Sequence, residues 1–373
     1  MKKLLLTLVF IIIIGVVPVL GDYSYYDEDN GDEIWYIAAS ALVMDAITGE
    51  ILYERDGFTP RYPASITKVM TSLLVLEHIE DLSAPLTFSA HAIDIPYYAS
   101  RMWVVEGETI TVLEGLYGNM LPSGNEVSRA LAELVSGSVP DFVALMNRRA
   151  VELGAYHTNF VNPCGLPGHG QFTTAYDISL IMREAIRHPI FVDIISTAYF
   201  NIAPTAFSPD GRTIRNTNRM IRPAEDEFNE YVIGGKTGFT NAAQHTLVTY
   251  AQRGDYTFII ATLFAPHWRY TFADTAALID HAYEIMQERA IAEAEAYQPE
   301  AEEEIYEPVY IEAYDDEIET YIEAYDEVIE IFLQQNPNDL SDTEAFTVAV
   351  MSLGLVAIAL LFIWWFWKKV SIR

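Results

Sequence analysis

Two short patterns in the sequence contain residues that together could perform nucleophilic catalysis. Ser65 and Lys68 are three residues apart in Ser65-Ile66-Thr67-Lys68, so on a helix their side chains share one face. A serine hydroxyl is a weak nucleophile until a base takes its proton, and a lysine whose pKa is lowered by burial can be that base. Backbone N–H groups at a helix start also favour a developing oxyanion.

The second pattern is Lys236-Thr237-Gly238, which combines a cation, a hydroxyl and a glycine that leaves room for a ligand. On the edge of a strand, this combination suits an anionic, peptide-like substrate. Ser123-Gly124-Asn125 lies between the two patterns, in a turn that precedes a helical pattern, and adds a hydroxyl and an amide. We interpret the three segments as parts of one active site.

The use of lysine supports this interpretation. Lys68 and Lys236 are the only lysines between the terminal segments, whereas the chain has 16 arginines. Arginine does not lose its proton in a protein, but a desolvated lysine can. A chain that otherwise uses arginine therefore needs lysine chemistry at these two places.

The hydrophobic periodicity predicts a mixed α/β fold that positions these residues. A strand within 34–44, a turn at 45–50 and a returning strand at 51–54 read as a hairpin, and 64–78 has helical spacing. Further helical patterns occur at 112–120, 126–135, 140–153, 174–187 and from about 272, and strand-like runs at 231–235, 246–251 and 256–264. Strands at both ends of a helical middle predict one antiparallel sheet built from distant segments, with helices on its faces.

Charge is distributed unevenly along the chain. The net charge is −31, and residues 290–344 contain 19 Asp and Glu without any Lys or Arg. This balance argues against a nucleic-acid partner, which would require a basic face. An 11-residue repeat, Tyr310–Asp315 and Tyr321–Asp326, is compatible with a right-handed coiled coil or with divalent-cation binding, but unpaired carboxylates favour a solvated, self-repelling linker, here assigned to 287–344.

The two ends predict export and membrane attachment. Residues 1–21 combine a basic start, an apolar run and a cleavage site, as in a secretory signal peptide. Residues 345–367 carry no charge and are long enough for a transmembrane helix, and the basic tail at 368–373 is expected in the cytoplasm. The body of the protein would then face outward.

The sequence gives no indication of a cofactor or a metal. None of the eight histidines has metal-ligand spacing. Cys164 is the only cysteine, which excludes an internal disulfide, and we expect its thiol to be a small buried hydrophobic group.

The motifs resemble those of a known family. Ser-x-x-Lys, Ser-x-Asn and Lys-Thr-Gly in this order are the signature of penicillin-binding proteins and serine β-lactamases. The surroundings are similar to low-molecular-mass D-alanyl-D-alanine carboxypeptidases in segments spread over about residues 35–285. These segments are Met44–Glu50, Pro63–Thr71, Leu121–Asn125, Asn159–Pro163, Thr174–Asp177, Asn216–Asn218 and Gly235–Thr240.

The resemblance implies a β-lactamase/transpeptidase-like fold at 35–286, an antiparallel sheet flanked by helices plus a helical subdomain. It implies that Ser65 attacks the bond between two terminal D-alanines of a peptidoglycan stem peptide, with Lys68 as base, Ser123 relaying protons and Asn125 positioning Lys68. Lys236, Thr237 and Gly238 would receive the terminal carboxylate, and the N–H groups of Ser65 and Phe239 would form the oxyanion hole. β-Lactam antibiotics would be covalent inhibitors.

The chain departs from the family pattern in two ways. Members often carry a further arginine for the carboxylate, whereas the matching position here is Thr271 and the nearest candidate is Arg269. We also expect the acidic linker to take the place of the small β-rich domain that often precedes the membrane anchor in this family.

Two other functions remain as alternatives. A serine β-lactamase would need fast deacylation, commonly with a Glu-x-x-x-Asn loop. Glu225 to Asn229 has that spacing but lies too close to Lys236 for that loop. The other alternative is a non-catalytic cell-wall-binding protein, although all the key residues are present.

Overall fold

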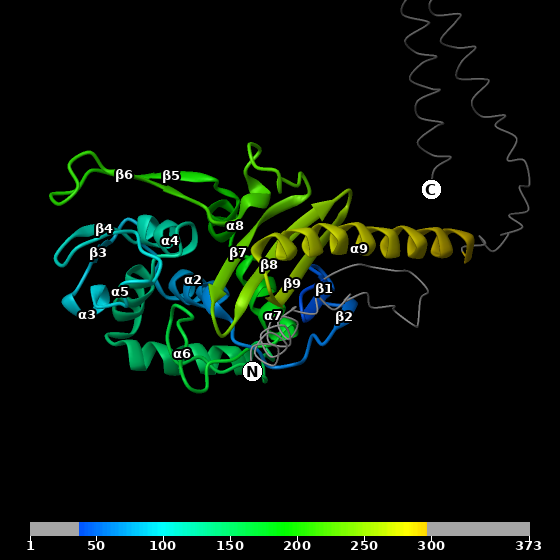
Figure 1. The fold of residues 1–373 in the computed structure, drawn as a ribbon, viewed down its shortest axis with the longest axis horizontal. Helices are drawn as coiled ribbons and strands as arrows, with labels where there is room; N and C mark the ends of the chain where they lie inside the picture. The colour runs from blue at the N-terminus through cyan, green and yellow to red at the C-terminus, as the bar shows by residue number, and fades with distance from the viewer. Residues whose placement is uncertain (1–36, 297–373) are drawn as a thin grey trace, which may run out of the picture. The chain divides into compact units, whose positions relative to one another are not determined.

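The computed structural model describes residues 37–296 of the chain. Its centre is a five-stranded antiparallel sheet with the strand order β2-β1-β9-β8-β7, in which the first and the last strands of the described segment lie side by side (Figure 1). The strands are β1 (Ser40–Asp45), β2 (Ile51–Arg55), β7 (Val232–Thr240), β8 (Gln244–Arg253) and β9 (Tyr256–Ala265). The predicted antiparallel sheet from distant segments is confirmed, and β7, which carries Lys236, is an edge strand.

Alternating residues of the central strands divide the core between the two faces of the sheet. Val43 and Ile260 pack with α9 (Trp268–Ala296), whereas Met44 and Ile259 belong to the larger core shared with α7 (Ala175–Ala185). Figure 1 shows α9 lying along one face of the sheet. These layers agree with the predicted α/β, β-lactamase-like arrangement.

The helical region carries the other half of the site. Its helices are η1 (Ala64–Thr67), α2 (Lys68–His78), α3 (Ala90–Ile93), α4 (Val112–Met120), α5 (Asn125–Ser136), α6 (Val139–Glu152) and α8 (Pro189–Ser196). Two small hairpins accompany them, β3 (Pro85–Thr87) with β4 (Thr109–Thr111) and β5 (Tyr199–Ile202) with β6 (Arg212–Arg215), and η2 (Arg219–Ile221) follows β6. The predicted helix at 64–78 begins as a 3₁₀ turn and continues as α2.

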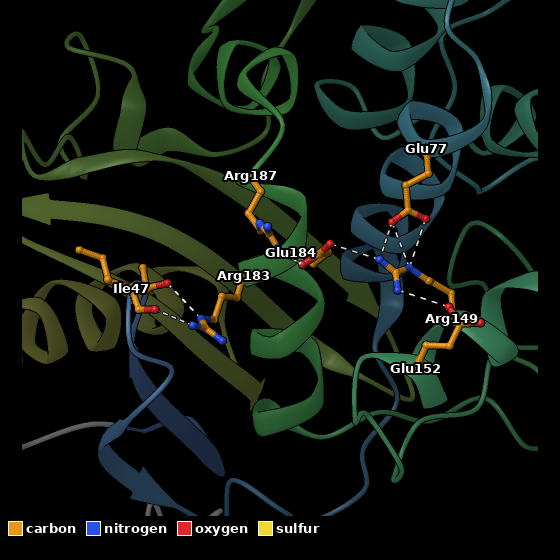
Figure 2. A network of polar contacts seen from close by, with 8 residues as sticks. Ile47, Glu77, Arg149, Glu152, Arg183, Glu184 and Arg187 are labelled. Atoms are coloured by element: carbon orange, nitrogen blue, oxygen red, sulfur yellow. Dashed lines mark hydrogen bonds and ion pairs between the residues drawn. The ribbon is translucent and has the colours of Figure 1, made fainter.

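A network of ion pairs fixes the far end of α2 (Figure 2). Arg149 of α6 binds Glu77 of α2 at 2.7 Å and Glu184 of α7 at 3.2 Å. Arg183 of α7 continues the network by donating to the carbonyl groups of Ala46 and Ile47 in the turn between β1 and β2. The helix that carries Lys68 is therefore tied to two neighbouring helices and, through α7, to the hairpin turn.

The last helix crosses the boundary expected at residue 286. α9 continues to Ala296, although the residues after Met286 are all exposed. None of the helices in residues 37–296 is both long and apolar enough to cross a bilayer. The predicted signal peptide, the rest of the linker and the transmembrane segment lie outside the described residues.

Candidate active site

The structure brings the three motif segments together around a cavity of about 710 Å³. Ser65 and the Ser123–Asn125 turn contribute to its lining from the helical region, and Thr237, Gly238 and Phe239 contribute from the edge strand β7. A cavity of this size accommodates a small peptide-like ligand. The residues that the motifs suggested as one site are therefore neighbours in space.

Lys68 is fully buried at the base of this site, directly beside Ser65. Its Nζ donates to Ser65 Oγ at 3.1 Å, to Asn125 Oδ1 at 3.0 Å and to the carbonyl oxygen of Cys164 at 2.8 Å. The three acceptors come from η1, α5 and the loop before α7, so the ammonium group is held from three directions. Burial lowers the pKa of Lys68 to about 8, against the opposing effects of Cys164 and Glu126.

A close packing of loop and strand positions Ser65. Ala64, the residue before it, adopts a left-handed backbone conformation with φ 49°. A Cβ atom at Gly165 would lie 1.7 Å from the Ala64 carbonyl oxygen, and one at Gly238 would lie 2.8 Å from the Ser65 backbone nitrogen. Only glycine allows these approaches, which bring β7 and the 162–165 loop against the nucleophile.

Ser123 and Asn125 occupy a strained turn at the start of α5. Ser123 has φ 63°, and its buried hydroxyl has no hydrogen-bond partner among the described residues. The Asn125 amide nitrogen donates to the carbonyl of Ser100 at 2.8 Å, which turns the amide oxygen towards Lys68. The Ser123 hydroxyl therefore remains available to a ligand, whereas Asn125 is already engaged.

On the strand side of the site, the lysine side chain makes fewer hydrogen bonds than Lys68 does. Lys236 is 1% exposed, and the only hydrogen bond of its side chain among the described residues goes to the Thr237 carbonyl at 2.9 Å. Burial lowers the pKa of Lys236 well below its usual value, and the neighbouring Lys68 charge lowers it further. Thr237 shares a 2.6 Å hydroxyl contact with Thr217, which also lines the cavity. An arriving carboxylate would favour the charged form of Lys236.

Arg269 is the arginine that the sequence suggested for binding the substrate carboxylate. Arg269 is 64% exposed, contacts Glu227 at 3.9 Å and does not belong to the cavity lining. Arg219 does line the cavity, although Glu225 and Glu227 already neutralise it. Thr271, at the position where relatives often carry arginine, turns its hydroxyl to the Trp268 carbonyl.

Several contributors were not identified from the sequence. The carbonyl of Cys164, which accepts from Lys68, has no side-chain signal in the sequence, and the Cys164 thiol is buried as expected. Asn162 organises that loop by accepting the N–H groups of Cys164 and Gly165. The Asn159–Pro163 motif was the available signal, because its Asn162 holds the loop in which Cys164, the residue after the motif, offers its carbonyl to Lys68.

Comparison with known proteins agrees with this geometry. A family model described as D-alanyl-D-alanine carboxypeptidase matches residues 30–267. D-alanyl-D-alanine carboxypeptidase DacF of Bacillus subtilis is 31% identical over 290 residues, which cover 76% of this chain and 71% of that protein.

Solved structures show the same fold. The DD-transpeptidase of Streptomyces K15 has a TM-score of 0.63 at 27% identity, over 68% of this chain and 99% of that one. A D-alanyl-D-alanine carboxypeptidase of Mycobacterium tuberculosis also has a TM-score of 0.63, at 28% identity, over 70% of this chain and 96% of that one. Together with the match of the family model over most of the chain, this shows that the protein belongs to the D-alanyl-D-alanine carboxypeptidase family.

Proposed function

We propose that the protein is a serine carboxypeptidase that removes the terminal D-alanine from peptidoglycan stem pentapeptides. The observation that carries this proposal is the fully buried Lys68, whose Nζ lies 3.1 Å from Ser65 Oγ at a cavity bordered by the Lys-Thr-Gly strand. A lysine with a pKa of about 8 is in part neutral near neutral pH and can then accept the serine proton.

Acylation follows from this arrangement. Ser65 Oγ attacks the carbonyl carbon of the penultimate D-alanine while its proton passes to Lys68 Nζ. The N–H groups of Ser65 and Phe239 stabilise the oxyanion, in keeping with the close approach of β7 to the Ser65 nitrogen. The C–N bond then breaks, and the leaving amine takes a proton through the free hydroxyl of Ser123. The products are D-alanine and an ester on Ser65.

The terminal carboxylate of the substrate binds on the strand side. Lys236 is buried and has spare N–H donors, and the next residue, Thr237, lines the cavity with its hydroxyl against that of Thr217. Charge-assisted hydrogen bonds of this kind are about twice as strong as neutral ones, which favours a free C-terminus over an internal peptide bond. This preference for a chain end distinguishes a carboxypeptidase from an endopeptidase.

Water completes the cycle by attacking the ester and releasing the shortened peptide. A fast β-lactamase commonly uses a dedicated carboxylate base for this step. Glu225, the candidate from the sequence, pairs with Arg219 and Arg222 and does not line the cavity. We therefore favour slow hydrolysis of β-lactams, which makes these antibiotics covalent inhibitors of the protein.

Labelling with a fluorescent penicillin tests this assignment. The native protein should form a stable covalent adduct, and Ser65→Ala should form none because the attacking oxygen is gone. An unlabelled native protein would rule out the catalytic function and favour the wall-binding alternative. Rapid turnover of a chromogenic β-lactam would instead favour the β-lactamase.

We also propose that the catalytic domain works outside the cytoplasmic membrane. The support is in the sequence, namely the signal-peptide pattern at 1–21, the acidic linker at 287–344 and the apolar segment at 345–367. Protease treatment of intact protoplasts would test the location, since an outward-facing domain is degraded and a cytoplasmic one is protected.

A further inference from the structure

Glu126, the residue that follows Asn125, is a buried carboxylate with no role in the mechanism above. It is 1% exposed, and its Oε1 accepts the backbone N–H groups of Met102 at 2.6 Å and Trp103 at 3.0 Å. Its second oxygen is also buried and has no hydrogen-bond partner among residues 37–296. A buried, incompletely paired carboxylate is costly, so its presence beside the site calls for a compensating role.

The segment that Glu126 holds is itself strained. Trp103 has φ 66°, a left-handed conformation that is unfavourable for a bulky residue. In this conformation two successive N–H groups point at one oxygen of Glu126, an arrangement that binds anions. The carboxylate therefore stabilises a backbone shape that the segment would not adopt by its own preference.

This segment forms part of the cavity and also orients Asn125. Tyr98, Ala99 and Ser100 line the cavity just before the two residues that Glu126 binds. The Ser100 carbonyl accepts both the backbone N–H of Asn125, at 3.0 Å, and its side-chain amide, at 2.8 Å. Because the amide nitrogen is engaged there, the amide oxygen faces Lys68 Nζ at 3.0 Å.

We propose that Glu126 is a positioning residue of the acylation reaction. It clamps residues 102 and 103, keeps the Ser100 carbonyl in place and thereby holds the Asn125 amide in the orientation that receives Lys68. The inference rests on the proposed function, because it concerns how the general base is kept in place.

The negative charge of Glu126 has a second, measurable consequence, an effect on the pKa of Lys68. The Glu126 charge raises the pKa of Lys68, as does Cys164, in opposition to the larger lowering by burial. Lys236, on β7, is the other cation that interacts with Lys68. Burial raises the pKa of Glu126 itself, while the N–H groups that it binds and the nearby Arg101 act in the opposite direction. Removing the Glu126 charge should therefore lower the pKa of Lys68.

The experiment measures acylation of the full chain by a fluorescent penicillin as a function of pH, with thermal unfolding to confirm folding. Glu126→Gln keeps an acceptor oxygen but removes the charge. Acylation should therefore persist, and the pH range over which its rate rises should move to lower pH. Glu126→Ala removes the clamp and should slow the acylation step about tenfold to a hundredfold, the cost of a small misplacement.

Glu133 provides matched controls. It lies two turns further along the same helix, and its carboxylate binds Ser89 and His91 instead of the cavity segment. Glu133→Gln should keep the native pH profile, and Glu133→Ala should keep the native acylation rate.

Two results would overturn the inference. One is an acylation rate of Glu126→Ala equal to that of the native protein or of Glu133→Ala. If Glu126→Ala does not fold, the decision falls to Glu126→Gln, and a pH profile that overlaps the native one would refute the role. Either result with normally labelled native protein leaves the proposed function intact, whereas absence of labelling in the native protein contradicts both.

Discussion

The two buried lysines of the site have opposite surroundings. Lys68, on the helical side, meets three acceptors from three segments, whereas Lys236, on the strand side, has only the neighbouring Thr237 carbonyl among the described residues. A lysine with a full set of partners is fixed in place, and the lowered pKa of Lys68 lets it act there as a base. A lysine with spare donors is a receptor for an incoming anion. The comparison indicates that similar side chains, equally buried, serve as base and as anchor because of what surrounds them.

Replacing the base should have the largest effect. Lys68→Arg keeps a cation but cannot give up its proton, so acylation by a penicillin should fall about a thousandfold or more. Stopped-flow or quenched labelling measures the rate, and thermal unfolding checks that the variant folds. Acylation within tenfold of the native rate would mean that Lys68 is not the base.

Replacing the anchor should have a smaller effect. Lys236→Arg keeps the charge in a larger group, so kcat/KM for a stem pentapeptide should fall about tenfold to a hundredfold through misplacement of the carboxylate. Steady-state release of D-alanine provides the measurement. A loss as complete as that of Lys68→Arg would erase the distinction between the two lysines.

The pH dependence of the acylation rate should follow the protonation of Lys68. Because burial lowers the pKa of this base to about 8, the reactive neutral form is lost as pH falls below that value. The acylation rate should then decrease about tenfold for each pH unit well below 8. An ordinary lysine stays fully protonated between roughly pH 5 and pH 8. An acylation rate that is flat over this range would contradict the assignment of Lys68 as the base.

The smallest effects concern the two arginines near the strand side. Arg269→Ala should leave kcat/KM within about twofold of the native value, because its contact with Glu227 is long and largely exposed. Both guanidinium groups stack on Trp268, but Arg219→Ala should have the larger effect, since only Arg219 lines the cavity. The same D-alanine assay ranks the two. The reverse order would restore Arg269 as the carboxylate-binding arginine.

Much of the fold was predictable because its signals are local. The helix at 112–120 was predicted at its observed bounds, since its apolar spacing is regular and Thr111 with Glu114 forms a capping box. Strand β7 was predicted only to residue 235 but continues to Thr240. Glycine and lysine are poor strand formers, and pairing with β8 overrides that preference.

The sequence predicted the parts of the site in which side chains carry the chemistry. It did not predict the parts in which backbone groups do. Ser65, Lys68 and Asn125 were found from their spacing, and the structure brings them within hydrogen-bond distance. The carbonyl of Cys164 has no sequence signature, because any residue supplies one. Glu126 was missed for a related reason: its importance depends on a segment more than twenty positions away along the chain.

The most direct test of the central claim is release of D-alanine from a synthetic stem pentapeptide by the native protein and by Ser65→Ala. We expect the native protein to release one D-alanine per peptide and to form a Ser65-linked acyl intermediate, and we expect neither with the alanine variant. Release of D-alanine by Ser65→Ala at the native rate, or none by a native protein that penicillin labels, would contradict it.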